Sequence, residues 1–171
     1  MWVLRHVAEI AATGAPGDVP LDLQAVQLAA LYHDAVYDPA ATKPAANEIA
    51  SAALAGACAS AFEWSDERAD HVEQLVFATA GHVAADVDAA VLLDADLAIL
   101  GAEPAAYSAY VHGVRLEYHH VAPPQWVVGR AAVLRSFLDR PAIFATPHMA
   151  ATREARARAN LSAELATLAQ S

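Results

Sequence analysis

Apolar and polar positions recur along this chain with the period of an α-helix over most of its length. Two loops rich in proline interrupt the pattern, GAPGDVP at residues 14–20 and DPAATKP at 38–44. No run keeps the strict alternation of a half-buried strand over more than a few residues. We therefore expect an all-α fold, a single helical-bundle domain over residues 1–171 with about seven or eight helices. The helices are expected near residues 1–13, 21–37, 45–60, 66–80 (with Asp66 as N-cap), 86–101, 103–121, 123–140 and 148–169.

The fifth expected helix, DVDAAVLLDADLAILG, carries a carboxylate on its apolar face. Positions 89, 92, 93, 96, 99 and 100 share one side of a helix, and all are apolar except Asp96. Asp94 lies two residues away and therefore points to a different side. Two interpretations of Asp96 stay open: a salt-bridged or partly exposed residue, and a metal-binding or catalytic one.

Two further polar anomalies lie on the first and second expected helices. His6 interrupts the apolar pattern of VLRHVAEIA, and His33 and Asp34 stand side by side at the end of an apolar stretch. A buried charge without a partner is costly, and a divalent metal is one partner that these side chains could share. Taken singly, each histidine is more often a hydrogen-bonded core residue. Taken with Asp96, they indicate a site that joins helices one, two and five.

Composition narrows the class of protein. Hydrophobic residues make up 57% of the chain and charged residues 18%, which excludes a disordered chain. The formal net charge of -10 disfavours nucleic acid and anionic membrane surfaces as partners. The chain has one cysteine, no signal peptide pattern and no apolar run long enough to span a membrane. We expect a cytoplasmic protein, and its alanine-rich helix surfaces could support a homodimer.

A series of short blocks resembles a known family. In chain order these blocks read LAALYHDAVYDP, NEIASA, FATAGH, LLDADLAILGA, VRLEY, GRAAVLRSFLDRPAIF and ARANLSAEL. With the isolated His6, they resemble the HD superfamily of metal-dependent phosphohydrolases, and more closely one predicted bacterial branch of it. The His-Asp pair alone is a weak signal because the dipeptide is common. The ordered series runs over nearly the whole chain and is far more specific.

The resemblance implies an HD-type helical domain in which four residues bind one divalent metal, namely His6, His33, Asp34 and Asp96. The metal could be Mn²⁺, Fe²⁺, Co²⁺, Ni²⁺, Zn²⁺ or Mg²⁺, because mixed histidine and carboxylate ligands suit all of them. The implied chemistry is hydrolysis of a phosphate ester, with Asp34 orienting or deprotonating the attacking water.

The same blocks suggest further site residues. His82 is expected to contact the substrate phosphate or a second metal, with a surface-loop histidine as the alternative. Glu48 and Asn47 are expected to orient the attacking water or a ligand, with helix capping as the alternative. Arg115 is the best-placed phosphate-binding cation by motif, and Lys43 could also reach a phosphate. For Arg115 a role in holding helices together is equally open, and for Lys43 the alternative is a solvated side chain.

One departure from the family's pattern bears on activity. Relatives open with a histidine that protonates the leaving group, followed by an asparagine, but here Trp2 and Val3 stand at those positions. The family's preceding segment is also missing, so either the start of the reading frame is misplaced or the chain is an N-terminally shortened member that has lost its general acid. We expect a metal-dependent phosphohydrolase acting on a small phosphorylated metabolite such as a nucleotide. The alternatives are a catalytically weakened module that binds metal and nucleotide, and a helical structural protein whose polar cluster is a salt-bridged core.

Overall fold

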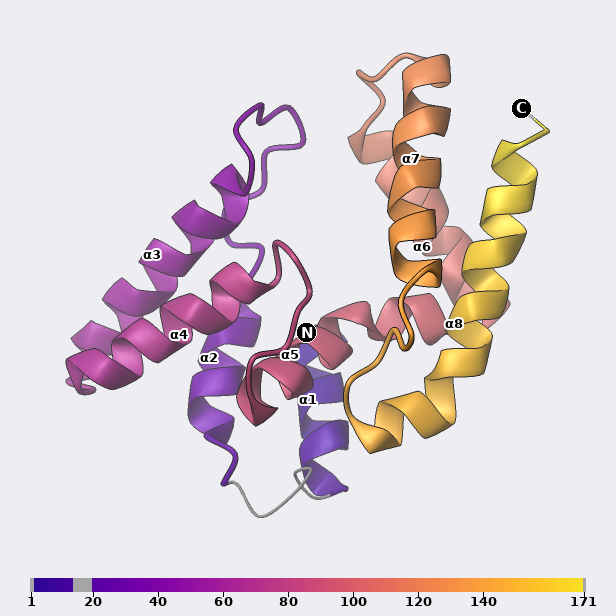
Figure 1. The fold of residues 1–171 in the computed structure, drawn as a ribbon. Helices are drawn as coiled ribbons and strands as arrows, with labels where there is room; N and C mark the ends of the chain where they lie inside the picture. Colours follow the sequence, from indigo (N-terminus) through magenta and orange to yellow (C-terminus); the bar gives the residue numbers. More distant parts are fainter. Residues whose placement is uncertain (1, 14–19, 171) are drawn as a thin grey trace. The chain divides into compact units, whose positions relative to one another are not determined.

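The computed structural model describes residues 2–13 and 20–170, and within these ranges the chain is all-α, without a strand (Figure 1). This confirms the predicted fold class. Eight α-helices and one 3₁₀ helix are present in the described ranges. They are α1 (Trp2–Ala12), α2 (Leu23–Tyr32), α3 (Ala46–Ala61), α4 (Asp66–Ala78), α5 (Val87–Asp96), η1 (Leu97–Gly101), α6 (Pro104–Glu117), α7 (Pro123–Leu138) and α8 (Pro147–Leu168). Most of the predicted loop at residues 14–20 lies outside the described residues.

The chain forms two compact units that divide after Asp96. The first holds α1 to α5, and the second holds η1 and α6 to α8. The organisation as a single domain therefore stays a prediction. Within the described residues no helix is long and apolar enough to cross a membrane.

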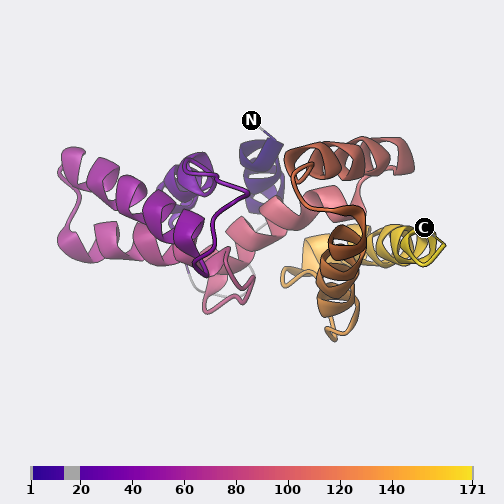
Figure 2. The ribbon, with the colours of Figure 1, turned by 90° about the horizontal axis from the view of Figure 1, so that it is seen from above.

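In the first unit, α3 and α4 run side by side (Figure 2), and α1 and α2 pack against α5. The face that α3 buries consists of small residues: Ser51, Ala52, Ala55, Gly56 and Ala59. Small side chains let two helix backbones approach closely, which explains the extensive α3–α4 contact. Helix α5 is buried along eight consecutive positions, 88–95, as expected for a helix at the centre of a core.

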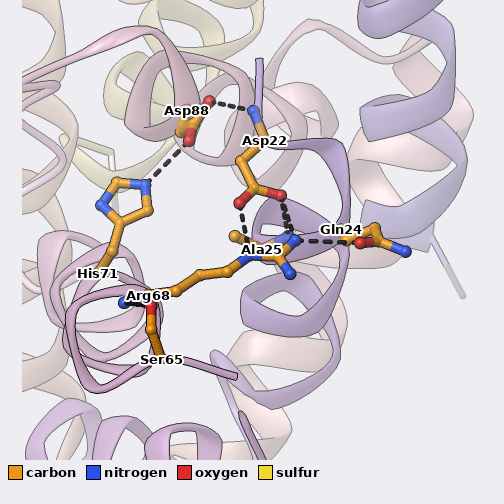
Figure 3. Close-up of polar contacts among 7 residues, drawn as sticks. All are labelled: Asp22, Gln24, Ala25, Ser65, Arg68, His71 and Asp88. Carbon is orange, nitrogen blue, oxygen red and sulfur yellow. Dashed lines mark hydrogen bonds and ion pairs between the residues drawn. The ribbon is translucent and has the colours of Figure 1, made fainter. Parts of the chain in front are cut away.

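A polar network ties the starts of α2 and α5 to α4 (Figure 3). Asp22 caps α2 by accepting the N–H of Ala25 at 3.1 Å, and it accepts two hydrogen bonds from Arg68 at 2.6 and 2.7 Å. Asp88 accepts the backbone N–H of Asp22 at 3.1 Å, and its other oxygen lies 2.9 Å from Nε2 of His71. The hydrogen bonds from Arg68 are the main reason why the pKa of Asp22 is lowered. The network thus joins α2, α4 and α5 through hydrogen bonds and ion pairs between polar groups.

The second unit is held together by contacts of α8. Asn160 donates to the carbonyls of Leu100 and Ala102 at 2.8 and 2.9 Å, which satisfies the end of η1. Gly101 faces Arg153 so closely that a Cβ at position 101 would lie 2.7 Å from the Cβ of Arg153. Only a glycine therefore permits this approach of η1 to α8.

A buried ion pair joins α7 to α8 in the same unit. Arg130 donates to both oxygens of Glu164, at 2.7 and 3.0 Å, and both side chains are only 7% exposed. The hydroxyl of Tyr107 on α6 donates to Glu164 at 2.5 Å. Burial, then this hydrogen bond, raises the pKa of Tyr107. Three helices thus share one satisfied charge cluster.

Some predicted boundaries were wrong. Helix α2 ends at Tyr32 rather than at residue 37, so His33 is its C-cap and Asp34 lies in a turn. Asp66 is the first residue of α4, and Ser65 is the N-cap, because its extended backbone lets Oγ accept the N–H of Arg68. The fifth predicted helix changes to a 3₁₀ helix after Asp96.

Candidate functional site

Four polar side chains meet in the first unit, at the ends of three elements. His33 and Asp34 follow α2, Asp96 ends α5, and His82 lies in the turn after α4. Nε2 of His33 lies 3.4 Å from Oδ2 of Asp34 and 3.4 Å from Oδ1 of Asp96. Nε2 of His82 lies 3.0 Å from the other oxygen of Asp96. We call His33, Asp34, His82 and Asp96 the histidine–carboxylate cluster.

Hydrogen bonds to backbone carbonyls of α2 fix the orientation of His33. Its backbone N–H donates to the carbonyl of Ala29 at 2.8 Å, and its Nδ1 lies 3.0 Å from the carbonyl oxygen of Ala30. A carbonyl only accepts, so Nδ1 carries a proton and Nε2 faces the carboxylates. Burial works to lower the pKa of His33, but the hydrogen bond and charge of Asp96, followed by the charge of Asp34, outweigh it. The pKa is raised to about 9.

Asp96 is the hub of the cluster. Burial opposes its ionisation, but hydrogen bonds from His33 and His82 outweigh this effect and hold its pKa well below the usual range. The expected apolar face through Asp96 is not present, and of the two interpretations left open the structure shows an ion-paired, partly exposed residue, while a metal-binding or catalytic role stays a prediction. Asp96 is 23% exposed, whereas Asp94 is 1% exposed. Because α5 is buried on all sides and gives way to a 3₁₀ helix, no single α-helical face runs on to residues 99 and 100.

His82 adopts a backbone conformation that non-glycine residues rarely adopt. Its φ is 50°, in the left-handed region, and its N–H closes the turn by donating to the carbonyl of Ala78 at 2.9 Å. A left-handed residue other than glycine costs on the order of 1 kcal/mol, and such residues are common at functional sites. The turn brings the imidazole of His82 to Asp96, so the structure joins this predicted catalytic residue to one predicted metal ligand.

His6 is buried, and contacts within α1 hold it. Its Nδ1 lies 2.8 Å from Oε2 of Glu9, its Nε2 lies 3.3 Å from Nη2 of Arg5, and the ring of Trp2 packs edge-on at 4.8 Å. Helix α1 packs against α5 and α2, the helices whose ends carry the cluster. Contacts within α1 thus engage both ring nitrogens of His6, and its role as a metal ligand stays a prediction.

The described residues contain no group of three or more His, Cys, Asp or Glu side chains arranged to hold a metal ion as they stand. Instead, the cluster is closed by ion pairs. Its chemistry nevertheless fits a divalent cation. Ligand atoms about 2.1 Å from a tetrahedral metal lie about 3.4 Å apart, which matches the two distances from Nε2 of His33. A histidine whose Nδ1–H donates to a backbone carbonyl is also the usual form of a metal ligand.

Charge is distributed unevenly along the chain. Fifteen of the twenty acidic side chains lie within the first 96 residues, and only three of the ten basic ones do, Arg5, Lys43 and Arg68. A strongly acidic region raises the local concentration of cations. It also repels a phosphate unless a cation is bound, so charge favours a cation in the first unit.

The other predicted site residues are placed as follows. Asn47 lies in the first turn of α3 and bonds both backbone groups of Asp38, while Glu48 beside it is half-buried. Lys43 is exposed in the loop before α3. Arg115, in the second unit, donates to the carbonyls of Tyr118 and Val121 and lies 5.2 Å from the ring of Trp126. These contacts favour local structural roles for Asn47 and Arg115, and binding of substrate by them stays a prediction.

Sequence reasoning missed one residue beside the cluster. Ser51, fully buried on α3, bonds the backbone of the loop that carries Asp34. The available signal was a serine one helical turn after Asn47 in a run of which half the residues are alanine. No protein-family model, curated protein or solved structure matches this chain.

Proposed function

We propose that this chain is a metal-dependent phosphohydrolase that acts on a small phosphorylated metabolite such as a nucleotide. The observation that carries the proposal is the orientation of the His33 imidazole. Its Nδ1–H is tied to the carbonyl of Ala30, and its Nε2 faces the oxygens of Asp34 and Asp96. Support also comes from the ordered series of blocks that resembles the HD superfamily.

In this proposal His33, Asp34 and Asp96 hold the cation, joined by His6 from α1. When bound, a divalent cation supplies Lewis acidity, which makes water a stronger nucleophile and polarises a phosphoryl oxygen. Asp34 is suited to accept a proton from water because its side chain is 67% exposed. His82 keeps Asp96 ionised and, as the cluster's second imidazole, is the group best placed to approach a substrate phosphate.

The test is release of product from a panel of nucleotides, phosphomonoesters and cyclic phosphodiesters with Mn²⁺, and with chelator as control. We expect cleavage of one substrate class that chelator abolishes. Asp34→Ala should lower the rate by about 10²–10⁴-fold. The matched control is Asp70→Ala, an exposed carboxylate on α4, which should leave the rate unchanged. Full activity of Asp34→Ala, or cleavage that resists chelator, would exclude this mechanism.

A second candidate function is a module that binds metal and nucleotide with little turnover. The observation that favours it is Trp2, whose ring packs edge-on against His6 where relatives place a general acid. Trp2→His separates the two candidates. If the chain is a weakened module, this variant should gain up to about 10²-fold in rate, since a general acid typically contributes that much or more. An active wild-type protein that gains nothing would argue for the enzyme.

A further inference from the structure

The loop after His33 is unusually long for a helical protein. Residues 33–45 connect α2 to α3, whereas helix–helix connections in bundles typically have about 2–8 residues. Ordered loops of this length are usually functional. Asp34 lies near the start of the loop and is exposed, so helix packing does not fix its position. The N–H of Ala35 donates to the carbonyl of Tyr32 at 2.9 Å and closes the turn at Asp34, and beyond this turn other contacts must hold the loop.

Two side chains of α3 hold this loop by its backbone. Oγ of Ser51 accepts the N–H of Val36 at 3.0 Å and donates to the carbonyl of the same residue at 3.3 Å. The amide of Asn47 does the same for Asp38: Oδ1 accepts its N–H at 3.0 Å, and Nδ2 donates to its carbonyl at 3.1 Å. Each side chain therefore satisfies both backbone groups of one loop residue.

The spacing of the two pairs explains why they fit. Asn47 and Ser51 are four residues apart on α3, a rise of about 6 Å. Val36 and Asp38 are alternate residues, which in an extended chain lie about 6.6 Å apart and present their N–H and C=O groups to the same side. In a β-sheet, the backbone of a neighbouring strand would form these hydrogen bonds. Here the side chains of Asn47 and Ser51 on α3 form them instead. We call these four hydrogen bonds the α3 ladder.

We propose that Asn47 and Ser51 are positioning residues, whose ladder fixes the segment that carries Asp34 against His33; this inference rests on the function proposed above. The upstream end of the segment is fixed by the hydrogen bonds from His33 to α2, and the ladder fixes the downstream end from two residues beyond Asp34. Ser51 is fully buried, so water does not replace its hydroxyl when it is removed.

The test compares Asn47→Ala and Ser51→Ala with Ser60→Ala, an exposed serine on the same helix. Amide hydrogen exchange is measured at Val36 and Asp38, and Mn²⁺ affinity is measured below the unfolding transition. Loss of the ladder should speed exchange about fivefold at the residue whose partner is removed. It should weaken Mn²⁺ binding about tenfold, as loss of an outer partner of a metal site does. Ser60→Ala should change neither quantity.

The outcomes separate this inference from the proposed function. If exchange accelerates but both variants bind Mn²⁺ as tightly as the wild-type protein, the ladder is merely structural and the inference is wrong. Unchanged exchange would show that the ladder does not hold the loop. If the wild-type protein and His33→Gln both fail to bind Mn²⁺, the proposed function falls, and the positioning role falls with it.

Discussion

The ion pairs of His33 predict how the stability of the metal-free protein depends on pH. In the folded chain the pKa of His33 is about 9, against about 6.5 in an unfolded chain. Because the folded value is the higher one, the stabilisation is complete below pH about 6.5. It is lost as the pH rises through about 9, where the folded imidazole loses its proton. A difference of about 2.5 pKa units corresponds to about 3 kcal/mol in the free energy of unfolding.

The perturbation is a pH series from about 6 to 10 in chelator, and the assay is the free energy of unfolding from denaturant titration. Wild-type protein is compared with His33→Gln, whose side chain is close in size and does not titrate. Other titrating groups contribute alike to both proteins, so the difference between the two curves isolates His33. We expect this difference to shrink by about 3 kcal/mol over the series.

An independent measurement is the chemical shift of the His33 ring protons, which should titrate near pH 9. Two parallel stability curves, or a ring that titrates at pH 6.5 or below, would refute the reasoning. Either result would mean that the contacts of His33 with Asp34 and Asp96 do not hold the imidazole in its charged form.

Three further predictions concern the rest of the molecule. Glu164→Leu should cost about 3–5 kcal/mol, because it leaves the buried guanidinium of Arg130 unpaired, and it should lower the unfolding temperature by roughly 10 °C. Glu164→Leu with Arg130→Met should recover most of this loss in thermal unfolding; an equally unstable double variant would contradict the account. Gly101→Ala should destabilise by about 1–3 kcal/mol in denaturant titration, because its Cβ would meet α8 at 2.7 Å. Gly129→Ala, where nothing lies within 4 Å, should stabilise by about 0.5–1 kcal/mol, and equal effects at both positions would refute this. The pKa of Asp22 is lowered, so its contribution is present above pH about 4 and is lost at lower pH. Acid unfolding of Asp22→Asn should therefore show a shallower pH dependence than that of the wild-type protein, and identical slopes would contradict this.

Most helices were predictable because local signals mark them. Prolines occupy the first turn of α6, α7 and α8, where the missing N–H costs nothing. The end of α2 was not predictable in this way. The residues after Tyr32 continue a helical pattern of apolar positions, but Ser51 and Asn47 bind the backbone of Val36 and Asp38 instead. That competition comes from a different helix, so no local pattern reveals it.

The candidate site was predictable only in part. The hydrophobic pattern singled out His33, Asp34 and Asp96, the block resemblance added His82, and the structure brings these four together. The helical-face argument for Asp96 was weaker than it looked. On a helix that is buried on every side, position on a face says nothing about depth, and Asp94 proved to be the deeper carboxylate.

The side chains of the histidine–carboxylate cluster are paired with one another, and this pairing determines how strongly the fold would depend on a bound cation. Asp96 has a histidine on each oxygen, and protonated His33 supplies a positive charge between two carboxylates. The cluster is therefore satisfied without a metal, unlike sites in which like charges face one another until a metal arrives. A cation that enters must replace the proton on Nε2 of His33, so it gains only the difference between two satisfied states. If the proposed metal binds, it would therefore serve the proposed chemistry and not the folding of the first unit, which its core and the Asp22 network stabilise without a cation.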